Sequence, residues 1–430
     1  MKHITLGFGH REVTVTLPAH RLLDIVTGKD VPSITDVPKA VHDALHRPIG
    51  SPPLPQVVSP GDKVAVIVSD LTRMWVRHDL FLPPLLDELN QAGVPDADIK
   101  LVVALGAHRR HTGEENISTY GSETVRRVAI EQSSALDADD FVYLGTTSRG
   151  VPVEINRHVA QADKVILTGG IVYHSMAGFS AGRKAVLPGV ASYASIQGNH
   201  SFCLHPQIGQ GLNPACDSGS LDNNPMHQDQ LEIAQMLNPA FLLNAVYTAD
   251  GDFAHFVAGH WHEAWLEGCR AVADISGVTI SGQADITLIS AGGFPKDINF
   301  YQGSKSIENA YAATKPGGVI IAAMECRDIN DPPDFSQWFE YTSLLDREMA
   351  LREAFTVPGF VALKLGMVAR NVTVIMVSLP ENAAFFAKAG MLTAGTVEEA
   401  LAMAESKLGR QDATITVMPC AAATVPLHRP

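Results

Sequence analysis

The sequence predicts an α/β protein of two domains, each built on a mostly parallel sheet flanked by helices, with the functional site in the cleft between them. Three observations support this fold class. A length of 430 residues corresponds to two or three domains at about 150 residues each. Short apolar runs typical of buried parallel strands alternate with segments of helical periodicity. Finally, this alternation stops and starts again near Val278.

The first half of the chain contains a hairpin and then alternating strands and helices. Residues 1–20 alternate apolar and polar side chains around Gly9-His10, which predicts a β-hairpin. After a proline-rich connector, the pattern predicts strand 63–69, helix 80–92, strand 99–105, a helix from Glu114 and strand 164–168. Such alternation is typical of right-handed βαβ units in a doubly wound sheet.

The second half repeats this pattern. It predicts strand 286–290, helix 304–313, a break at 315–318, strands 319–323 and 372–377, helices from Glu381 and over 397–408, and strand 413–417. The boundary therefore falls between Gly268 and Val278. We expect an N-terminal domain over residues 1–272, a smaller C-terminal domain over 273–418 and a tail over 419–430.

Composition excludes several classes of protein. With 46% hydrophobic and 18% charged residues, the chain is neither disordered nor a coiled coil. A net charge of −14 argues against nucleic acid and anionic membranes as partners. The five cysteines form no CxxC pair, so we expect free thiols and a cytoplasmic location. The uncharged stretch 165–182 is rich in glycine and polar residues, which indicates buried strand and loop.

Polar side chains follow three of the predicted strands. Asp70 and Arg73 come after strand 63–69, His108 after strand 99–105 and His174 after strand 164–168. Ligands of open α/β sheets bind beyond the carboxyl ends of strands. One histidine alone is more often structural, but two at equivalent strand ends favour a functional site. If the three strands share one sheet, these side chains meet at one edge.

Arg183 and Lys184 are the only charged residues between Lys164 and Asp217. A cationic pair inside a neutral, glycine-rich segment needs a partner, because burying an unpaired charge is costly. The partner is either a distant carboxylate or an anionic ligand. Alternatively, Lys184 is neutral and nucleophilic.

Two further groups of residues carry possible chemistry. His200, Cys203, His205 and Cys216 are candidates for a structural zinc site, but their spacing fits no zinc finger or ribbon. A single histidine that completes the coordination of a cofactor metal suits this segment better. Lys296 follows a strand in the loop Gly292–Asp297, which is either an ordinary turn or a loop that reaches the cleft.

Motifs of common nucleotide-binding enzymes are missing. No GxGxxG or GxxxxGK[ST] follows a strand, which argues against a Rossmann dehydrogenase and a P-loop enzyme. No GxSxG or HExxH is present either.

Six motifs in this order resemble the lactate racemase family. They are S-D-x-T-R at 69–73, A-L-G-x-H-R at 104–109, G-G-x-x-x-H at 169–174, G-R-K-x-x-L-P-G at 182–189, G-N-H at 198–200 and G-G-x-P-K-D at 292–297. The resemblance implies a racemase or epimerase of small 2-hydroxy acids. It also implies the nickel-pincer nucleotide, a pyridinium dithio mononucleotide with nickel, and cofactor-biosynthesis proteins as partners in maturation.

The resemblance also implies a role for individual residues. Lys184 matches the lysine that holds the cofactor covalently, His200 the protein ligand of nickel, and His108 and His174 the two catalytic histidines. The predicted cofactor-binding residues are Lys184, Asp70, Thr72, Arg73, Gly170 and Arg183, and the predicted substrate-binding residues are Arg73, Arg109 and Lys296.

Under this hypothesis, hydride leaves C2 of the substrate for the cofactor while one histidine takes the hydroxyl proton. The planar 2-keto acid then receives hydride on its other face. Two alternatives stay open, a two-base racemase that transfers protons without a metal and a carrier of the nickel cofactor without activity. The paired histidines favour catalysis.

The chain departs from the family pattern beside two motifs. Arg77 and His78 follow the first, and Arg110 and His111 follow the second, where relatives often have proline. We expect these residues at the mouth of the site, unless they are solvated surface charges. An arginine that faces inward would favour a substrate larger or more anionic than lactate.

Overall fold

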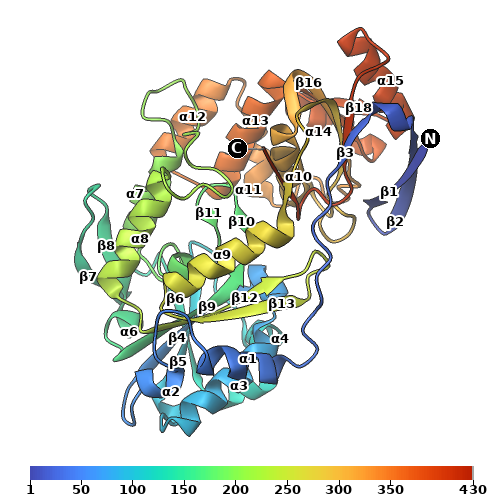
Figure 1. Cartoon of the computed structure of the whole chain (residues 1–430). Helices are drawn as coiled ribbons and strands as arrows, with labels where there is room; N and C mark the ends of the chain where they lie inside the picture. The colour runs from blue at the N-terminus through green and yellow to red at the C-terminus, as the bar shows by residue number, and fades with distance from the viewer. Residues whose placement is uncertain (429–430) are drawn as a thin grey trace. The chain divides into compact units, whose positions relative to one another are not determined.

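The computed structural model describes residues 1–428, and the chain forms two compact units (Figure 1). The central unit contains Asp30–Cys203 and Pro214–Ile275. The terminal unit contains Met1–Lys29, Leu204–Asn213 and the residues from Ser276 onward. Each unit is built on one six-stranded sheet, so the predicted α/β class with two sheets is confirmed.

The central sheet has the strand order β13-β12-β9-β4-β5-β6. Its strands are parallel except β13, which runs antiparallel to β12. They are β4 (Val64–Ser69), β5 (Ile99–Gly106), β6 (Ala129–Ser134), β9 (Lys164–Ile171), β12 (Phe241–Tyr247) and β13 (Phe253–Gly259). Two hairpins accompany the sheet, β7 (Phe141–Thr146) with β8 (Pro152–Asn156), and β10 (Tyr173–His174) with β11 (Gly178–Phe179).

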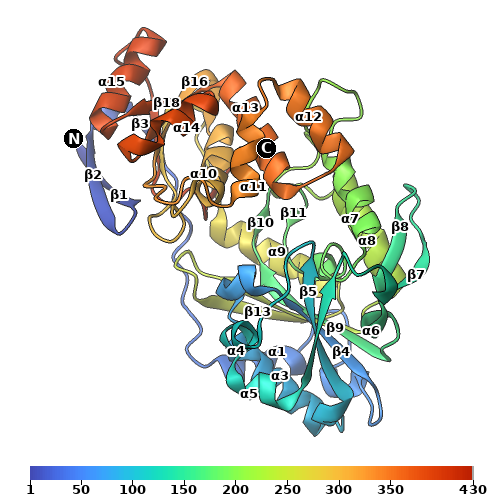
Figure 2. The same cartoon turned by 180° about the vertical axis from the view of Figure 1, so that it is seen from behind.

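Helices cover both faces of the central sheet, as Figures 1 and 2 show. Alternate residues of β4 enter different cores: Val66 packs with α1 and α3, whereas Ile67 packs with α9. This alternation explains why the strands are apolar throughout. The helices are α1 (Val37–His46), α2 (Leu54–Val57), α3 (His78–Gln91), α4 (Gly113–Tyr120), α5 (Ser122–Arg127), α6 (Arg157–Ala160), α7 (Tyr193–His200), α8 (Pro225–Leu237) and α9 (Glu263–Ser276).

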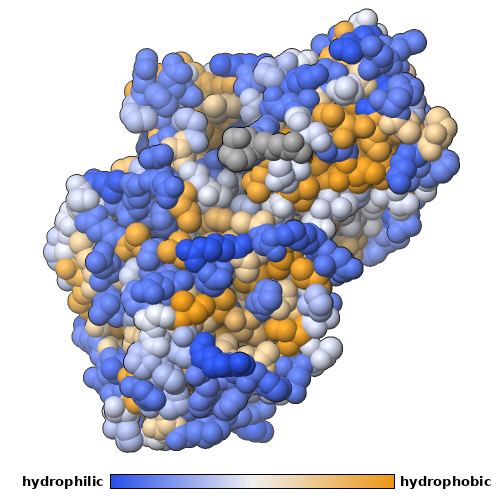
Figure 3. All heavy atoms as spheres, in the orientation of Figure 1, coloured by the Kyte–Doolittle hydropathy of each residue, from blue (hydrophilic) through white to orange (hydrophobic). Residues whose placement is uncertain are grey.

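The sheet of the terminal unit is parallel throughout, with the order β18-β17-β16-β15-β19-β3. Its strands are β3 (Leu22–Ile25), β15 (Ala284–Ser290), β16 (Thr314–Ala323), β17 (Thr373–Val377), β18 (Leu392–Ala394) and β19 (Ile415–Met418). Its helices are α10 (Phe300–Ala312), α11 (Pro333–Ser336), α12 (Leu344–Glu353), α13 (Val357–Asn371), α14 (Ala383–Lys388) and α15 (Val397–Leu408). The outward side of α15 is hydrophilic (Figure 3), and Ala400 and Ala404 face the core.

The structure divides the chain differently from the expected domains at both ends. The predicted hairpin forms, as β1 (Lys2–Phe8) with β2 (Arg11–Leu17), but its apolar face packs on the terminal sheet, and β3 pairs with β19. Residues 1–29 therefore belong with the C-terminal half. The expected tail contains β20 (Val425–Leu427), which pairs with β14 (Gly277–Thr279). Residues 429–430 lie outside the described part.

Two smaller expectations concern local structure. The predicted break at 315–318 lies inside β16 as an interruption of its pairing: Thr314 pairs with Ala284, the next pair joins Val319 to Ile286, and Gly317 between them has φ +74°. The uncharged stretch 165–182 forms β9, β10 and β11 with connecting loops, as predicted. Within residues 1–428, no helix combines the length and the apolar character that a bilayer span requires.

Residues 204–213 lie within the sequence of the central unit but pack with the terminal unit. The buried carboxylate of Glu348 on α12 accepts hydrogen bonds from the amides of Gly209, at 3.1 Å, and Gly211, at 2.8 Å. Arg352 on the same helix pairs with Glu348 at 2.6 Å and donates to the carbonyl of His205. One ion pair therefore holds this segment on α12.

We predict that Glu348→Ala lowers the free energy of unfolding of the terminal unit by about 2–3 kcal/mol, the usual contribution of hydrogen bonds to a charged group. Urea unfolding measures this loss, and limited proteolysis should show faster cleavage within residues 204–213. The exposed neighbour Glu353 provides the matched control as Glu353→Ala. Equal stability and cleavage of the two variants would contradict this role of Glu348.

Candidate active site

Three adjacent strands of the central sheet end at the same edge. β4 lies between β9 and β5, and all three are parallel. Asp70 and Arg73 follow β4, His108 follows β5 and His174 follows β9. The predicted convergence of these residues at the carboxyl ends of neighbouring strands is therefore confirmed.

Asp70 is buried and connects the residues of this edge. One carboxylate oxygen bonds to Nδ1 of His108. The other accepts from the hydroxyl of Thr72 at 2.7 Å and pairs with the guanidinium of Arg73 at 3.4 Å. Burial alone would raise the pKa of the Asp70 carboxyl, but the His108 hydrogen bond and the Arg73 charge outweigh burial and lower it. Asp70 is therefore an anion that orients three side chains.

The two histidines present different hydrogen-bonding atoms. Because a carboxylate only accepts, Nδ1 of His108 donates to Asp70 and Nε2 carries the lone pair. In His174, Nδ1 accepts from the amides of Met176, at 3.2 Å, and Ala177, at 3.3 Å, so Nε2 carries the proton. Burial, then the charges of Lys184 and Arg73, hold the pKa of His174 well below its usual range. The neutral tautomers of the two rings are therefore opposite, with Nε2 as the acceptor in His108 and as the donor in His174.

Close packing explains two glycines of the motifs. A Cβ on Gly170 would lie 2.8 Å from the ring of Tyr247 and 2.9 Å from that of Trp75. Gly182 has φ +53°, and a Cβ there would lie 2.5 Å from the ring of Trp265. These glycines let aromatic rings approach the backbone around Lys184.

Within residues 1–428, Arg183 pairs with no carboxylate, and its protein partners are an aromatic ring, an imidazole and backbone carbonyls. Its buried guanidinium lies over the ring of Trp265, at 4.0 Å from the centroid. It donates to Nδ1 of His227 at 3.0 Å and to the carbonyls of Phe179 and Ala177. An indole face, an imidazole and backbone carbonyls stabilise a cation without neutralising it. Arg183 thus organises the segment that carries Lys184.

Lys184 matches the alternative of a neutral lysine. Burial, followed by the charges of Arg183 and Arg73, lowers its pKa to about 7. The amine is therefore about half deprotonated at neutral pH, and its nucleophilic form is abundant there.

His200 lies at the end of α7 in the form that binds a metal. Its Nδ1 donates to the carbonyl of Ile196 at 3.0 Å, so the lone pair is on Nε2. Burial and the charge of Lys184 lower the pKa of His200 to about 3. Metal-binding histidines usually donate the other ring N–H to a carbonyl or carboxylate in this way.

The zinc site considered for the neighbouring cysteines does not form. Cys203 contacts the sulfur of Met226 at 3.2 Å, and Cys216 donates to the carbonyl of Phe202 at 3.4 Å. Within residues 1–428, the one set of three or more potential metal ligands lies elsewhere, and His205 belongs to the terminal unit.

Lys296 lies at the carboxyl edge of the sheet in the terminal unit. Its Nζ is 3.1 Å from the sulfur of Cys420, which follows the adjacent strand β19. The next residue, Asp297, is buried and accepts from the amides of Gly9 and Glu325. Contacts with Cys420, Gly9 and Glu325 therefore fix the loop that carries Lys296 within the terminal unit.

The structure gives no support to a strongly cationic site mouth. Arg77 pairs with Asp79 at 3.0 Å, and Arg110 pairs with Asp137. Arg109, predicted to bind substrate, forms two hydrogen bonds with Glu115, at 2.7 and 2.9 Å. Carboxylates thus satisfy these surface arginines: the partners of Arg77 and Arg109 lie two and six positions further along the chain, and that of Arg110 lies 27 positions further.

The expectation for His78 and His111 is corrected. His78 is buried against Thr168, at 3.2 Å, and burial lowers its pKa to about 3. His111 is also buried, and its Nε2 accepts from the amide of Leu71 at 2.9 Å. His78 therefore packs against β9, and His111 holds the loop after β4, so both rings have structural roles.

Sequence reasoning missed the residues that hold the site together. Trp265 and His227 stack on each other, at 5.6 Å between ring centroids, and both contact Arg183. They lie far from Arg183 in the sequence, and no local spacing points to them. Cys420 likewise lies 124 positions from its partner Lys296.

Known proteins of one family match this chain over most of its length. Models of the lactate racemase N-terminal and C-terminal domains match residues 8–211 and 280–425. A lactate racemase from Thermoanaerobacterium thermosaccharolyticum is 32% identical over 97% of this chain and 98% of its own length. Another, from Lactiplantibacillus plantarum, is 33% identical over 89% of both chains.

Solved structures support the same relationship. The lactate racemase apoprotein from T. thermosaccharolyticum superposes with a TM-score of 0.89 at 32% identity, covering 99% of this chain and 100% of that chain. A crystal structure of a Thermotoga maritima protein has a TM-score of 0.64 at 16% identity, over 91% of this chain and 98% of its own, and it shares the fold alone.

Fold, site and relatives define the class of this protein: it is an isomerase, and among isomerases a racemase. The chain belongs to the lactate racemase family.

We predict that acylation of Lys184 in the chain without cofactor has a pH midpoint near 7, as its pKa of about 7 requires. The rate should be low at pH 5, rise through pH 7 and level off above pH 8, because only the neutral amine reacts. Pulse labelling with acetic anhydride, normalised to an added amino acid and read by peptide mass spectrometry, measures the profile. A midpoint near 10, the ordinary value for lysine, would contradict the effect of burial.

Proposed function

We propose that this chain inverts C2 of a small 2-hydroxy acid by hydride transfer to and from a nickel-pincer nucleotide held on Lys184. The observation that carries the proposal is the arrangement of His108, with Nε2 as acceptor, and His174, with Nε2 as donor, beside a lysine whose pKa is lowered to about 7. The names of the relatives make lactate the first substrate to test.

The residues of the central unit fit this cofactor. Lys184 has the neutral amine that forming a thioamide requires, and His200 offers the unprotonated Nε2 that a metal needs. The imidazole of His200 would then be the protein's one ligand to the nickel, and the nucleotide would supply the others. Asp70, Thr72, Arg73, Gly170 and Arg183 remain predicted cofactor-binding residues, and for Arg183 the role we favour is to position Lys184.

When bound, the cofactor supplies an acceptor for the hydride from C2. The protein supplies the proton chemistry at the substrate oxygen. His108 accepts the hydroxyl proton at Nε2, and the Asp70 carboxylate stabilises the imidazolium that forms. His174 donates from Nε2 to the same oxygen and orients it. For the opposite enantiomer the roles exchange, which requires the amide hydrogen bonds at Nδ1 of His174 to open.

We propose that cationic side chains bind the carboxylate of the substrate. Arg73 keeps its guanidinium next to Asp70 and half-exposed, so it can pair with a carboxylate at the same edge. Lys296 and Arg109 remain predicted substrate-binding residues. Since Arg77 and Arg110 have carboxylate partners and His78 is buried, we propose a small monocarboxylate rather than a larger or more anionic acid.

Deuterium labelling tests the hydride mechanism. The chain matured with its cofactor should racemise lactate in deuterated water with C2 largely unlabelled, because the C2 hydrogen is kept and returned. Nuclear magnetic resonance of the newly formed enantiomer measures the label. Stoichiometric deuterium at C2 would assign the reaction to a two-base proton-transfer racemase, and a loaded chain without turnover would indicate a cofactor carrier.

We predict that Asp70→Asn lowers kcat by at least about 10²-fold in both directions, the usual contribution of a positioned acid or base. The amide cannot hold the His108 proton on Nδ1 as a carboxylate does, so the ring loses its orientation and basicity. His108→Ala and His174→Ala should lose at least as much. Steady-state rates from both enantiomers measure the effect, and Asp79→Asn on the exposed pair with Arg77 is the matched control. Retained activity in Asp70→Asn would exclude the dyad.

A further inference from the structure

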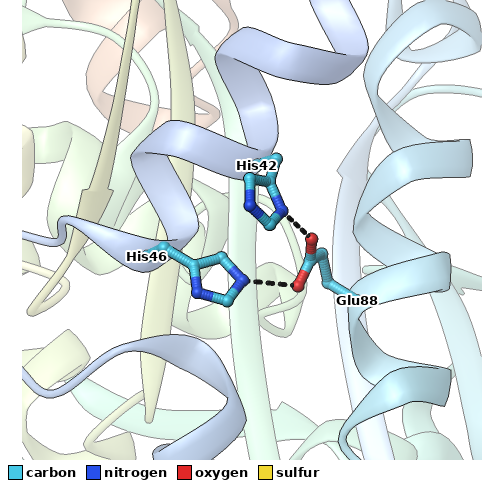
Figure 4. Close-up of side chains that lie close together, drawn as sticks. All are labelled: His42, His46 and Glu88. Carbon is cyan, nitrogen blue, oxygen red and sulfur yellow. Dashed lines mark hydrogen bonds and ion pairs between the residues drawn. The ribbon is translucent and has the colours of Figure 1, made fainter.

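A second group of potential metal ligands lies between α1 and α3. His42 and His46 on α1 point toward Glu88 on α3 (Figure 4). Nδ1 of His42 contacts one oxygen of the Glu88 carboxylate, and Nε2 of His46 lies 2.9 Å from the other. The three ligand atoms all lie within 4.8 Å of one another, and within residues 1–428 no other such set is found.

The backbone holds these side chains in place. His42 and His46 are four residues apart, which puts both on the same face of the helix. Val41 and Leu45, which directly precede the two histidines, are fully buried and pack in one core with Leu85 and Leu89 of α3. The relative position of the two helices is therefore set by apolar packing and does not depend on the polar cluster.

The donor set is suited to a borderline divalent cation. Two imidazoles and one carboxylate, with water in the fourth position, form a common tetrahedral zinc site. The Glu88 side chain is 7% exposed, whereas those of His42 and His46 are 54% and 39% exposed. A buried carboxylate under two half-exposed imidazoles leaves the outer side open to the ion and its water.

To hold an ion, both carboxylate–imidazole contacts of the cluster have to lengthen, that of His42 more than that of His46. Ligand atoms about 2.0–2.1 Å from zinc in a tetrahedron are roughly 3.3 Å apart, a few tenths of an ångström more than the 2.9 Å between His46 and Glu88. The exposed imidazoles can make this movement by small rotations, without any change in α1 or α3.

We propose that His42, His46 and Glu88 bind one zinc ion, with water as the fourth ligand, and that the ion links α1 to α3. This site is distinct from Lys184 and His200. The segment after Lys184 packs in the core on the other face of the central sheet, whereas α1 and α3 share the core described above. The proposal does not rest on the proposed function.

The test uses the full chain without cofactor, stripped of metal with a chelator. Zinc is titrated in competition with a chromogenic chelator. The wild-type chain is expected to bind one equivalent of zinc. His46→Gln and Glu88→Gln each remove a direct ligand, so they should bind zinc at least about 10-fold more weakly, because even changes to the outer partners of metal ligands usually cost about 10-fold or more. Zinc should also raise the unfolding temperature of the wild type more than that of either variant.

His158 and Glu131 provide the matched control. They form an exposed pair of one imidazole and one carboxylate, at 3.4 Å, without a second imidazole, and His158→Gln should bind zinc like the wild type. Cobalt(II) gives an independent readout, since tetrahedral coordination produces visible absorption that both cluster variants should lose. Circular dichroism establishes that the variants fold.

Three results would overturn the proposal. One is a wild-type chain that binds no zinc in competition with the chelator. The second is zinc affinity and stoichiometry that stay unchanged in His46→Gln and Glu88→Gln. The third is an equal loss in His158→Gln, which would mean that isolated surface pairs account for the binding.

Discussion

The site depends on how the protein buries the guanidinium of Arg183, which pairs with no carboxylate in the described part of the chain. Arg183 lies over Trp265, bonds to His227 and donates to two backbone carbonyls, so its charge is stabilised but not cancelled. That remaining charge acts on the adjacent Lys184, whose amine is already penalised by burial, and the two effects together bring its pKa to about 7. A carboxylate partner for Arg183 would have removed part of this effect. The low pKa of Lys184 is therefore a consequence of which groups contact Arg183.

A second constraint comes from the parallel sheet. Because β9, β4 and β5 are adjacent and parallel, residues separated by about a hundred positions arrive at one edge, and the strand ends determine which side chains can meet. The loops then decide what each side chain does. Asp70 turns His108 into a base, and the amides of Met176 and Ala177 turn His174 into a donor. The sheet therefore brings the two histidines together, and the loops determine which ring nitrogen of each neutral histidine carries the proton.

These two levels explain what the sequence could and could not predict. Apolar periodicity located β4, β5, β9, β15, α3 and α15 to within a few residues, because periodicity reports directly on burial. It missed the association of residues 1–29 with the terminal unit, since a hairpin has the same pattern whichever sheet it packs on. It also missed Trp265 and His227, because partners of Arg183 that come from distant helices leave no local signal. The expected cationic mouth failed for a related reason: the pairing of Arg77 with Asp79 depends on rotamers that spacing does not specify.

The histidines show why residue type alone does not assign chemistry. His78 is buried beside a hydroxyl and is held neutral, and His108 is exposed beside a buried carboxylate. His42 and His46 share another buried carboxylate, between α1 and α3. Glu88 and Asp70 thus act on imidazoles in the same way, as buried acceptors that fix ring orientation. The two sites differ in how many imidazoles contact the carboxylate and in where these imidazoles lie. Asp70 contacts one imidazole at the end of a strand, which leaves its second nitrogen for a substrate. Glu88 contacts two imidazoles one helical turn apart, which leave room for an ion.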